Sequence, residues 1–279
     1  MGIVSALKHE LRRGSEPPFP LRYGLRTLVH GTLTDSVPPR LYWRLAGLFR
    51  ERYAVDVAPY DRPLRPYKTV DLSPKLVTRL TGRAYPPWES RFDLFGSVRD
   101  GDWDRRPLDA DPKRHPSVQV YGGRRIRETT LYRSLAAHFQ RGRPWERTAL
   151  VETVEDALSD GHRVWHDCGS RAAALKRCEA LDVLYNAIRR DGFRSQLRLA
   201  SDGEFEPSGR PFPSVMRNEV GIDIGRDGTP LLVEGKHRFV IADLLGIETI
   251  PAVVYVRHTD WMKRRDAAAV QSENARSGR

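Results

Sequence analysis

Residues 230–258 read PLLVEGKHRFVIADLLGIETIPAVVYVRH, and their pattern predicts four consecutive pieces of structure. An apolar run at 231–233 predicts a buried strand, and a tight turn at Glu234-Gly235 follows it. Apolar residues then recur at helical spacing over 239–245, and the next residue is a glycine, which commonly ends a helix. The apolar run at 253–256 predicts another strand. The unit is therefore a strand, a turn, a helix and a second strand.

The turn in this unit has the features of an anion-binding corner. Gly235 carries no side chain, so the backbone there can pass close to a ligand. The residues after it fall in the first helical turn, whose N–H groups lack intrahelical partners and carry partial positive charge. Lys236, His237 and Arg238 add side-chain donors at the same place. These features predict a phosphate-binding corner. The alternative interpretation is a helix N-terminus that carries only surface cations.

This stretch resembles the ParB/sulfiredoxin superfamily, in which a Gly-x-[His/Arg]-Arg turn between a strand and a helix holds nucleotide phosphates. The matching residues are Gly235, His237, Arg238, Ala242, Gly246, Ile250 and Pro251. In a second match a helix ends in a turn that leads into the next strand, and it consists of Leu184, Ile188, Gly192, Phe193 and Gln196. The resemblance covers residues 175–258 and, more loosely, 67–110. It implies a mixed α/β fold, a small mixed sheet with helices, that binds ATP, ADP or CTP together with Mg²⁺.

Two branches of this superfamily fit the sequence poorly. Sulfiredoxins have a cysteine just before the His-Arg pair, where this chain has Lys236. Chromosome-partition proteins need a helix-turn-helix domain after the corner, and about twenty residues follow His258. With these two branches set aside, the resemblance implies a nucleotide-binding phosphotransferase that acts on a small molecule, or a nucleotide hydrolase. The alternative is a non-enzymatic ParB-like module that binds DNA or a nucleotide.

Phosphoryl transfer needs cations around the phosphates, a carboxylate that takes the acceptor's proton, and usually Mg²⁺. The corner residues, Lys236 to Arg238, fit the first role. Either Glu234, beside the turn, or Glu219, on the preceding predicted strand, fits the second. In the serine kinase branch of the superfamily an acidic residue directly before the turn is part of the site, and Glu234 stands there. For Glu219 the alternative is a solvated strand face.

A metal site is expected only if a particular loop lies over the corner. Asp102 and Asp104 flank Trp103, and carboxylates so placed can bind Mg²⁺ if this loop folds over the same corner. The alternative is a turn that its tryptophan anchors to the core. A zinc set drawn from His162, His166, Cys168 and Cys178 fits no common finger spacing.

The composition of the chain indicates which kinds of ligand and partner to expect. The formal net charge is +11, and only seven of the 47 basic residues are lysine, so arginine dominates. This bias favours phosphorylated or polyanionic ligands. Without a run of basic residues beyond pairs, we expect binding to DNA to be weak and non-specific. No apolar run is long enough to span a membrane, and two cysteines in a chain of this length favour a reducing, cytoplasmic location.

The pattern along the chain predicts three parts. Residues 1–66 read as a helical leader that ends in a proline-rich joint. The resemblance implies that residues 67–265 form a ParB/sulfiredoxin-like domain, with a helical insertion at about 128–170. Within this domain the segment 93–104 is expected to be a loop, because glycines and aspartates crowd it. Residues 266–279 read as a polar tail.

Overall fold

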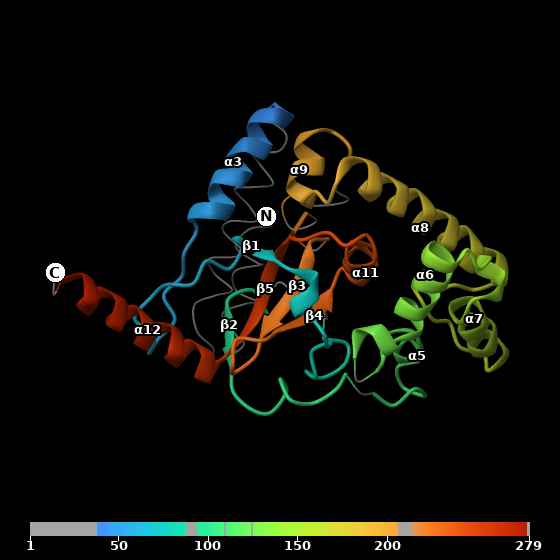
Figure 1. Ribbon diagram of the computed structural model, residues 1–279, viewed down its shortest axis with the longest axis horizontal. Coiled ribbons are helices and arrows are strands. Elements are labelled where there is room, and N and C mark those ends of the chain that lie inside the picture. The colour runs from blue at the N-terminus through green and yellow to red at the C-terminus, as the bar shows by residue number, and fades with distance from the viewer. Residues whose placement is uncertain are drawn as a thin grey trace, which may run out of the picture.

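The computed structural model describes residues 38–87, 94–108, 110–123, 125–205, 212, 215–216 and 218–277, and it describes side chains as far as residue 271. Within these ranges the chain forms eight α-helices and a five-stranded mixed sheet, so the predicted mixed α/β class is confirmed (Figure 1). Most of the predicted leader, residues 1–37, lies outside the described part. No helix in the described ranges is both long and apolar enough to cross a bilayer.

The sheet is built around one long strand near the C-terminus. Its members are β1 (Thr69–Leu72), β2 (Ser97–Arg99), β3 (Val220–Ile224), β4 (Pro230–Glu234) and β5 (Ile250–His258). The start of β5 pairs antiparallel with β1, and its end pairs parallel with β2. The other edge of β5 pairs parallel with β3, and β3 forms an antiparallel hairpin with β4. The hairpin and β5 therefore hold the turn after β4 at one end of the sheet.

Helices cover both faces of this sheet. They are α3 (Pro39–Arg52), α5 (Val118–Tyr121), α6 (Thr130–Arg141), α7 (Ala149–Ser159), α8 (Arg171–Asp191), α9 (Gln196–Ser201), α11 (Lys236–Leu244) and α12 (Thr259–Ser277). Helices α5 to α8 and α11 share one buried apolar cluster with one face of the strands. Helices α3 and α9 share a second cluster with the opposite face. Helix α12 follows β5 and points away from the sheet (Figure 1).

The strand sequences explain why both faces are covered. Along β4, Leu232 packs in the first cluster, whereas Leu231 and Val233 pack in the second. In β5, Val254 and Tyr255 divide in the same way. Alternate side chains of a strand point to opposite faces, so a continuous apolar run requires cover on both. The sequence of these two strands therefore demands a helical layer on each side.

The structure agrees with the predicted strand–turn–helix–strand unit, which is β4, the turn, α11 and β5. Two local expectations were wrong. Three residues of the expected loop form β2, because the end of β5 offers them an open edge. The strand expected after the second family match is instead α9, because the Ser195 side chain accepts a hydrogen bond from the Arg198 N–H and caps a helix there.

Candidate functional site

The predicted corner is a left-handed turn between β4 and α11. Gly235 has φ of +74° and precedes the first residue of the helix. A Cβ added at this glycine would lie 2.9 Å from Cα of Val220 on β3. Both the positive φ and this close approach exclude a side chain. The sequence argument assigned the glycine to ligand approach, but the structure shows that the neighbouring strand already requires it.

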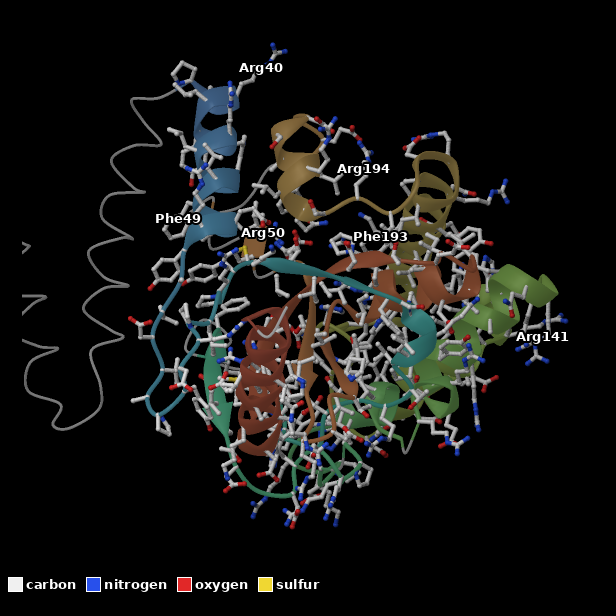
Figure 2. All side chains as sticks on the ribbon, turned by 60° about the vertical axis from the view of Figure 1, so that its left-hand side comes forward. Arg40, Phe49, Arg50, Arg141, Phe193 and Arg194 are labelled. Atoms are coloured by element: carbon white, nitrogen blue, oxygen red, sulfur yellow. The ribbon has the colours of Figure 1, made fainter. Side chains whose placement is uncertain are left out.

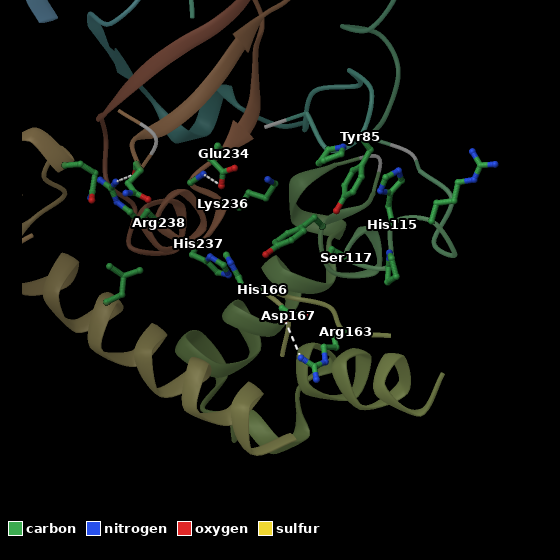
Figure 3. Close-up of a pocket in the computed structure, with 18 of the residues that line it drawn as sticks. Tyr85, His115, Ser117, Arg163, His166, Asp167, Glu234, Lys236, His237 and Arg238 are labelled. Atoms are coloured by element: carbon green, nitrogen blue, oxygen red, sulfur yellow. Dashed lines mark hydrogen bonds and ion pairs between the residues drawn. The ribbon is translucent and has the colours of Figure 1, made fainter. Parts of the chain in front are cut away.

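A cavity of 760 Å³ lies in front of this corner (Figure 3). One wall is the corner itself, Glu234 to Arg238. The opposite wall comes from the segment between α7 and α8, at residues 163 and 166–167, and a third from residues 114–117 and 121. Tyr85 closes a further side. The residues predicted from positions 234–238 therefore do share one cavity, with partners that are far away in the sequence.

Two of the predicted phosphate-binding cations are engaged by the protein's own backbone. The Arg238 guanidinium donates to the carbonyls of Asn218 and Arg194, each at 2.8 Å, and lies 4.5 Å from the ring centroid of Phe193. The Lys236 Nζ donates to the carbonyl of Val233 at 2.7 Å and lies 5.0 Å from the centroid of the Tyr121 ring. Both side chains line the cavity, but each also fixes local structure.

His237 differs from its expected role as a cation. Its Nε2 accepts a hydrogen bond from the indole N–H of Trp165 at 2.9 Å, which only the unprotonated nitrogen can do. Burial, together with the nearby charges of Lys236 and Arg177, lowers the pKa of His237 to about 3. At neutral pH this imidazole is therefore uncharged.

The residue that holds His237 belongs to a strained turn. Trp165, His166 and Asp167 have φ of 51°, 64° and 62°, a left-handed run without glycine. Such a conformation costs roughly 1–2 kcal/mol per residue, and it persists only where its surroundings enforce it. Here the Cys168 N–H donates to the Val164 carbonyl at 3.1 Å and closes the turn.

This turn presents His166 to the cavity. The ring of His166 stacks on that of His237, with centroids 5.4 Å apart (Figure 3). Its side chain is exposed and lines the cavity, yet desolvation in that wall and the charge of Arg177 lower the pKa of His166 to about 4. Two neutral imidazoles therefore lie side by side beside the corner.

Of the two predicted catalytic carboxylates, only Glu234 lines the cavity. It is half-buried at the end of β4, and its Oε1 accepts a hydrogen bond from the Gly235 N–H at 3.1 Å. Burial and the negative charge of Glu234 together raise the pKa of Tyr121, which also faces the cavity. From this position Glu234 can accept a proton, bind a metal ion or contact a group bound in the cavity.

Glu219 is a buried structural carboxylate. It is fully buried and receives hydrogen bonds from Arg50 at 2.9 Å and from the Gln196 N–H at 3.1 Å. Its Oε2 lies 3.9 Å from Arg238 Nη1. It is neither the solvated strand residue nor a cavity base, because its side chain is fully buried and lies outside the cavity lining. Its contribution to the corner is to oppose the charge of Arg238.

The loop with Asp102 and Asp104 does not fold over the corner. Both carboxylates bind the Arg226 guanidinium, at 2.7 and 2.8 Å, in the turn between β3 and β4. That turn is at the opposite end of the hairpin from Gly235, roughly 17 Å away for the five residues of β4 at the rise of a strand. The condition for the predicted metal site is therefore not met. In the described part of the chain no group of three His, Cys, Asp or Glu side chains is arranged to hold a metal ion.

Sequence reasoning missed the far walls of the cavity. The strained turn at 165–167 has no turn-forming glycine, so composition gave no signal for it. The density of His and Cys at 162–178 drew attention to this region, but for a zinc site rather than for a cavity wall. Tyr85 and residues 114–117 carry no motif, and only the tertiary fold brings them to the corner.

The comparisons with known proteins do not assign the chain to a family. No protein-family model matches the chain, and searches of the curated proteins and of the solved structures return no match.

Proposed function

We propose that this protein is a nucleotide-dependent phosphotransferase whose cavity binds the nucleotide phosphates at the start of α11, with Glu234 as the catalytic base or metal ligand. The observation that carries the proposal is the position of Glu234. Glu234 stands directly before a helix N-terminus and lines a cavity whose other charged groups are mostly basic. The proposal also places the chain in the ParB/sulfiredoxin superfamily.

The size and charge of the cavity support a nucleotide. Its 760 Å³ falls within the range of roughly 300–1,000 Å³ typical of small-molecule sites. Its lining holds four cationic side chains, Arg114, Arg163, Lys236 and Arg238, against two carboxylates, Asp167 and Glu234. The N–H groups of the first turn of α11 add partial positive charge. Such a lining favours a ligand with several negative charges.

The carboxylate argues for catalysis rather than for binding alone. An ionised Glu234 would repel a phosphate at the adjacent turn, unless a cation or a transferable proton stands between them. Mg²⁺ commonly binds one or two carboxylates and completes its shell with phosphate oxygens and water. Glu234 would hold such an ion, which would neutralise charge on the transferring group. In the other role, Glu234 accepts the proton of the acceptor hydroxyl as that oxygen attacks the terminal phosphorus and the nucleoside diphosphate leaves.

The test compares Glu234→Gln with Glu248→Gln. Glu248 is an exposed glutamate just beyond the C-terminal end of α11, so its substitution makes the same chemical change away from the cavity. Binding of ATP, ADP and CTP with Mg²⁺ is measured by calorimetry, and transfer of labelled γ-phosphate is measured against pools of small metabolites. We expect Glu234→Gln to abolish turnover and to retain nucleotide binding, whereas Glu248→Gln matches the wild type.

Other outcomes decide between functions. Release of inorganic phosphate without any acceptor, abolished by Glu234→Gln, would indicate a hydrolase. Nucleotide binding that Glu234→Gln leaves equal or tighter, with no turnover by the wild type, would indicate a non-enzymatic binder. Turnover by Glu234→Gln at the wild-type rate would exclude the catalytic role.

A further inference from the structure

The donors of the corner are unequally available to a ligand. Arg238 directs two of its N–H groups to backbone carbonyls, and the Lys236 Nζ also donates to one. His237 Nδ1 makes no hydrogen bond to any described residue, and the side chain lines the cavity. Among the three polar side chains of the corner, His237 therefore has a ring nitrogen that a ligand can reach without breaking a contact.

Trp165 determines what this nitrogen can do. The indole N–H is only a donor, so its partner, His237 Nε2, must carry a lone pair. A neutral imidazole has one proton, and with Nε2 unprotonated that proton resides on Nδ1. Lys236, Arg177 and the ring of His166 face His237, and each of them, when charged, opposes a second proton. The open nitrogen is thus an N–H donor on an uncharged ring.

The backbone supplies an independent observation. Trp165 is fully buried and belongs to the left-handed run of three residues that contain no glycine. Strain of this kind gathers at sites where position matters for function. Here the strain places two side chains beside one imidazole, the Trp165 indole at Nε2 and the His166 ring on its face. A turn that served only the core would not need to contact His237 twice.

We propose that Trp165 is a positioning residue that holds His237 as the Nδ1–H tautomer, so that His237 donates a hydrogen bond to an anionic oxygen of the ligand. This oxygen is a phosphoryl oxygen if the proposed function holds, and the donor role rests on that proposal, whereas the tautomer does not. A neutral donor suits this cavity, because a charged imidazole would face the positive charges of Lys236 and Arg177.

The tautomer is read first, without any ligand. Long-range ¹H–¹⁵N spectra of the full chain, with ¹⁵N-labelled histidine, distinguish Nδ1–H, Nε2–H and doubly protonated rings. The His237→Gln spectrum identifies the signals of His237 among the eight histidines. We expect the Nδ1–H form from pH 5 to pH 8. A ring that is Nε2–H or doubly protonated at pH 7 overturns the proposal.

A matched pair of tryptophan variants tests the role of the indole. Trp165→Phe keeps an aromatic ring and removes the N–H. Trp145→Phe removes an equivalent buried indole N–H, whose partner is Asp182 at 3.0 Å and which lies outside the cavity lining. We expect Trp165→Phe to give a mixture of His237 tautomers and an upward shift of its titration, and Trp145→Phe to give the wild-type signals. An unchanged His237 in a folded Trp165→Phe protein contradicts the positioning role.

The donor role is tested with inorganic pyrophosphate and with ADP as probes. The side-chain amide of asparagine places an N–H where His237 Nδ1 lies, whereas that of glutamine reaches the position of Nε2. We expect His237→Asn to bind the probes within a few-fold of the wild type, and His237→Gln to lose about ten-fold or more, the usual effect of a lost hydrogen bond to a charged group. Equal affinities of the two variants overturn the donor role.

The two proposals fail in different ways. If the probes shift the backbone amides of residues 235–238 but leave the His237 signals unchanged, the anion site stands and the donor role of His237 is wrong. If neither probe shifts any signal of the corner, both the phosphate site and the donor role are wrong.

Discussion

A single glycine sets the geometry of the corner, and its role can be measured. In Gly235→Ala the new methyl group meets the backbone of Val220 in a left-handed turn. We expect a loss of roughly 2–4 kcal/mol in the free energy of unfolding, from the positive φ and the overpacking together. Gly246→Ala is the control, because it has φ of +70° with no atom near its Cβ, so only the backbone cost, about 1–2 kcal/mol, applies. Urea denaturation of both variants tests this; equal losses would show that contact with β3 does not matter.

His237 also makes stability depend on pH. In the folded protein its pKa is lowered to about 3, and in the unfolded chain it is expected near 6.5. As the pH falls below the unfolded value, only the unfolded state gains the proton, so stability decreases. Between pH 7 and pH 5 this one group should remove about 2 kcal/mol, which His237→Gln would not lose. Urea denaturation at the two pH values measures the difference, and identical losses in both proteins would contradict it.

At the scale of elements, a buried ion pair ties α3 to the sheet. Arg50 on α3 is nearly fully buried and donates to Glu219 and to the Tyr67 carbonyl, each at 2.9 Å (Figure 2). In Arg50→Met, Glu219 keeps its buried charge without its closest cation. We expect a loss of roughly 3–5 kcal/mol, the usual cost of breaking a buried pair from one side. Arg44→Met, at an exposed site on the same helix, should change stability by no more than about 0.5 kcal/mol.

A double variant separates the pair from the packing of the helix. Arg50→Met combined with Glu219→Gln removes both charges, and it should recover much of the stability lost in the single variant. Thermal and urea unfolding of the wild type, the two single variants and the double variant give the four free energies of this double-mutant cycle. Additive losses would show that Arg50 stabilises α3 by packing alone.

The elements that the sequence predicted are those with local signals. Helix α8 has a serine cap at Ser170 and a glycine stop at Gly192, and β4 and β5 are continuous apolar runs. Strand β2 has only three residues, and it forms because β5 is available to pair with it. At the candidate site, too, the sequence predicted only what local signals can indicate. The sequence placed His237 at the corner, but the side chain that donates a hydrogen bond to it, Trp165, is 72 residues away in the chain.

At the scale of the whole molecule, the cavity lies where two differently patterned parts of the chain meet. The hairpin and α11 bring the corner at 234–238, and the segment between α7 and α8 brings the opposing turn at 165–167 (Figures 1 and 3). Sequence patterns describe each part by itself, because periodicity and capping act within an element. Which residues of this segment would face the corner depends on how α6 and α8 pack against α11, and no local pattern encodes that contact.

The net charge of +11 also belongs to the whole molecule, and it predicts only loose binding to duplex DNA. Exposed arginines such as Arg44, Arg133, Arg189 and Arg264 lie on α3, α6, α8 and α12, which point in different directions (Figure 1). Few of them can contact one duplex together, so we expect dissociation constants on the order of 10⁻⁴–10⁻⁶ M at physiological salt, without sequence preference.

Fluorescence anisotropy with two unrelated duplexes over a range of salt concentrations measures this binding, because the slope of log K against log salt counts the phosphates contacted. Saturating ADP should leave the DNA affinity unchanged, since the proposed nucleotide site is the cavity and the basic residues outside it remain exposed. Displacement of DNA by ADP would place the nucleic acid at the corner itself. Tight binding to one sequence against excess competitor would favour a DNA-binding module over the phosphotransferase, because scattered cations give no means of reading bases.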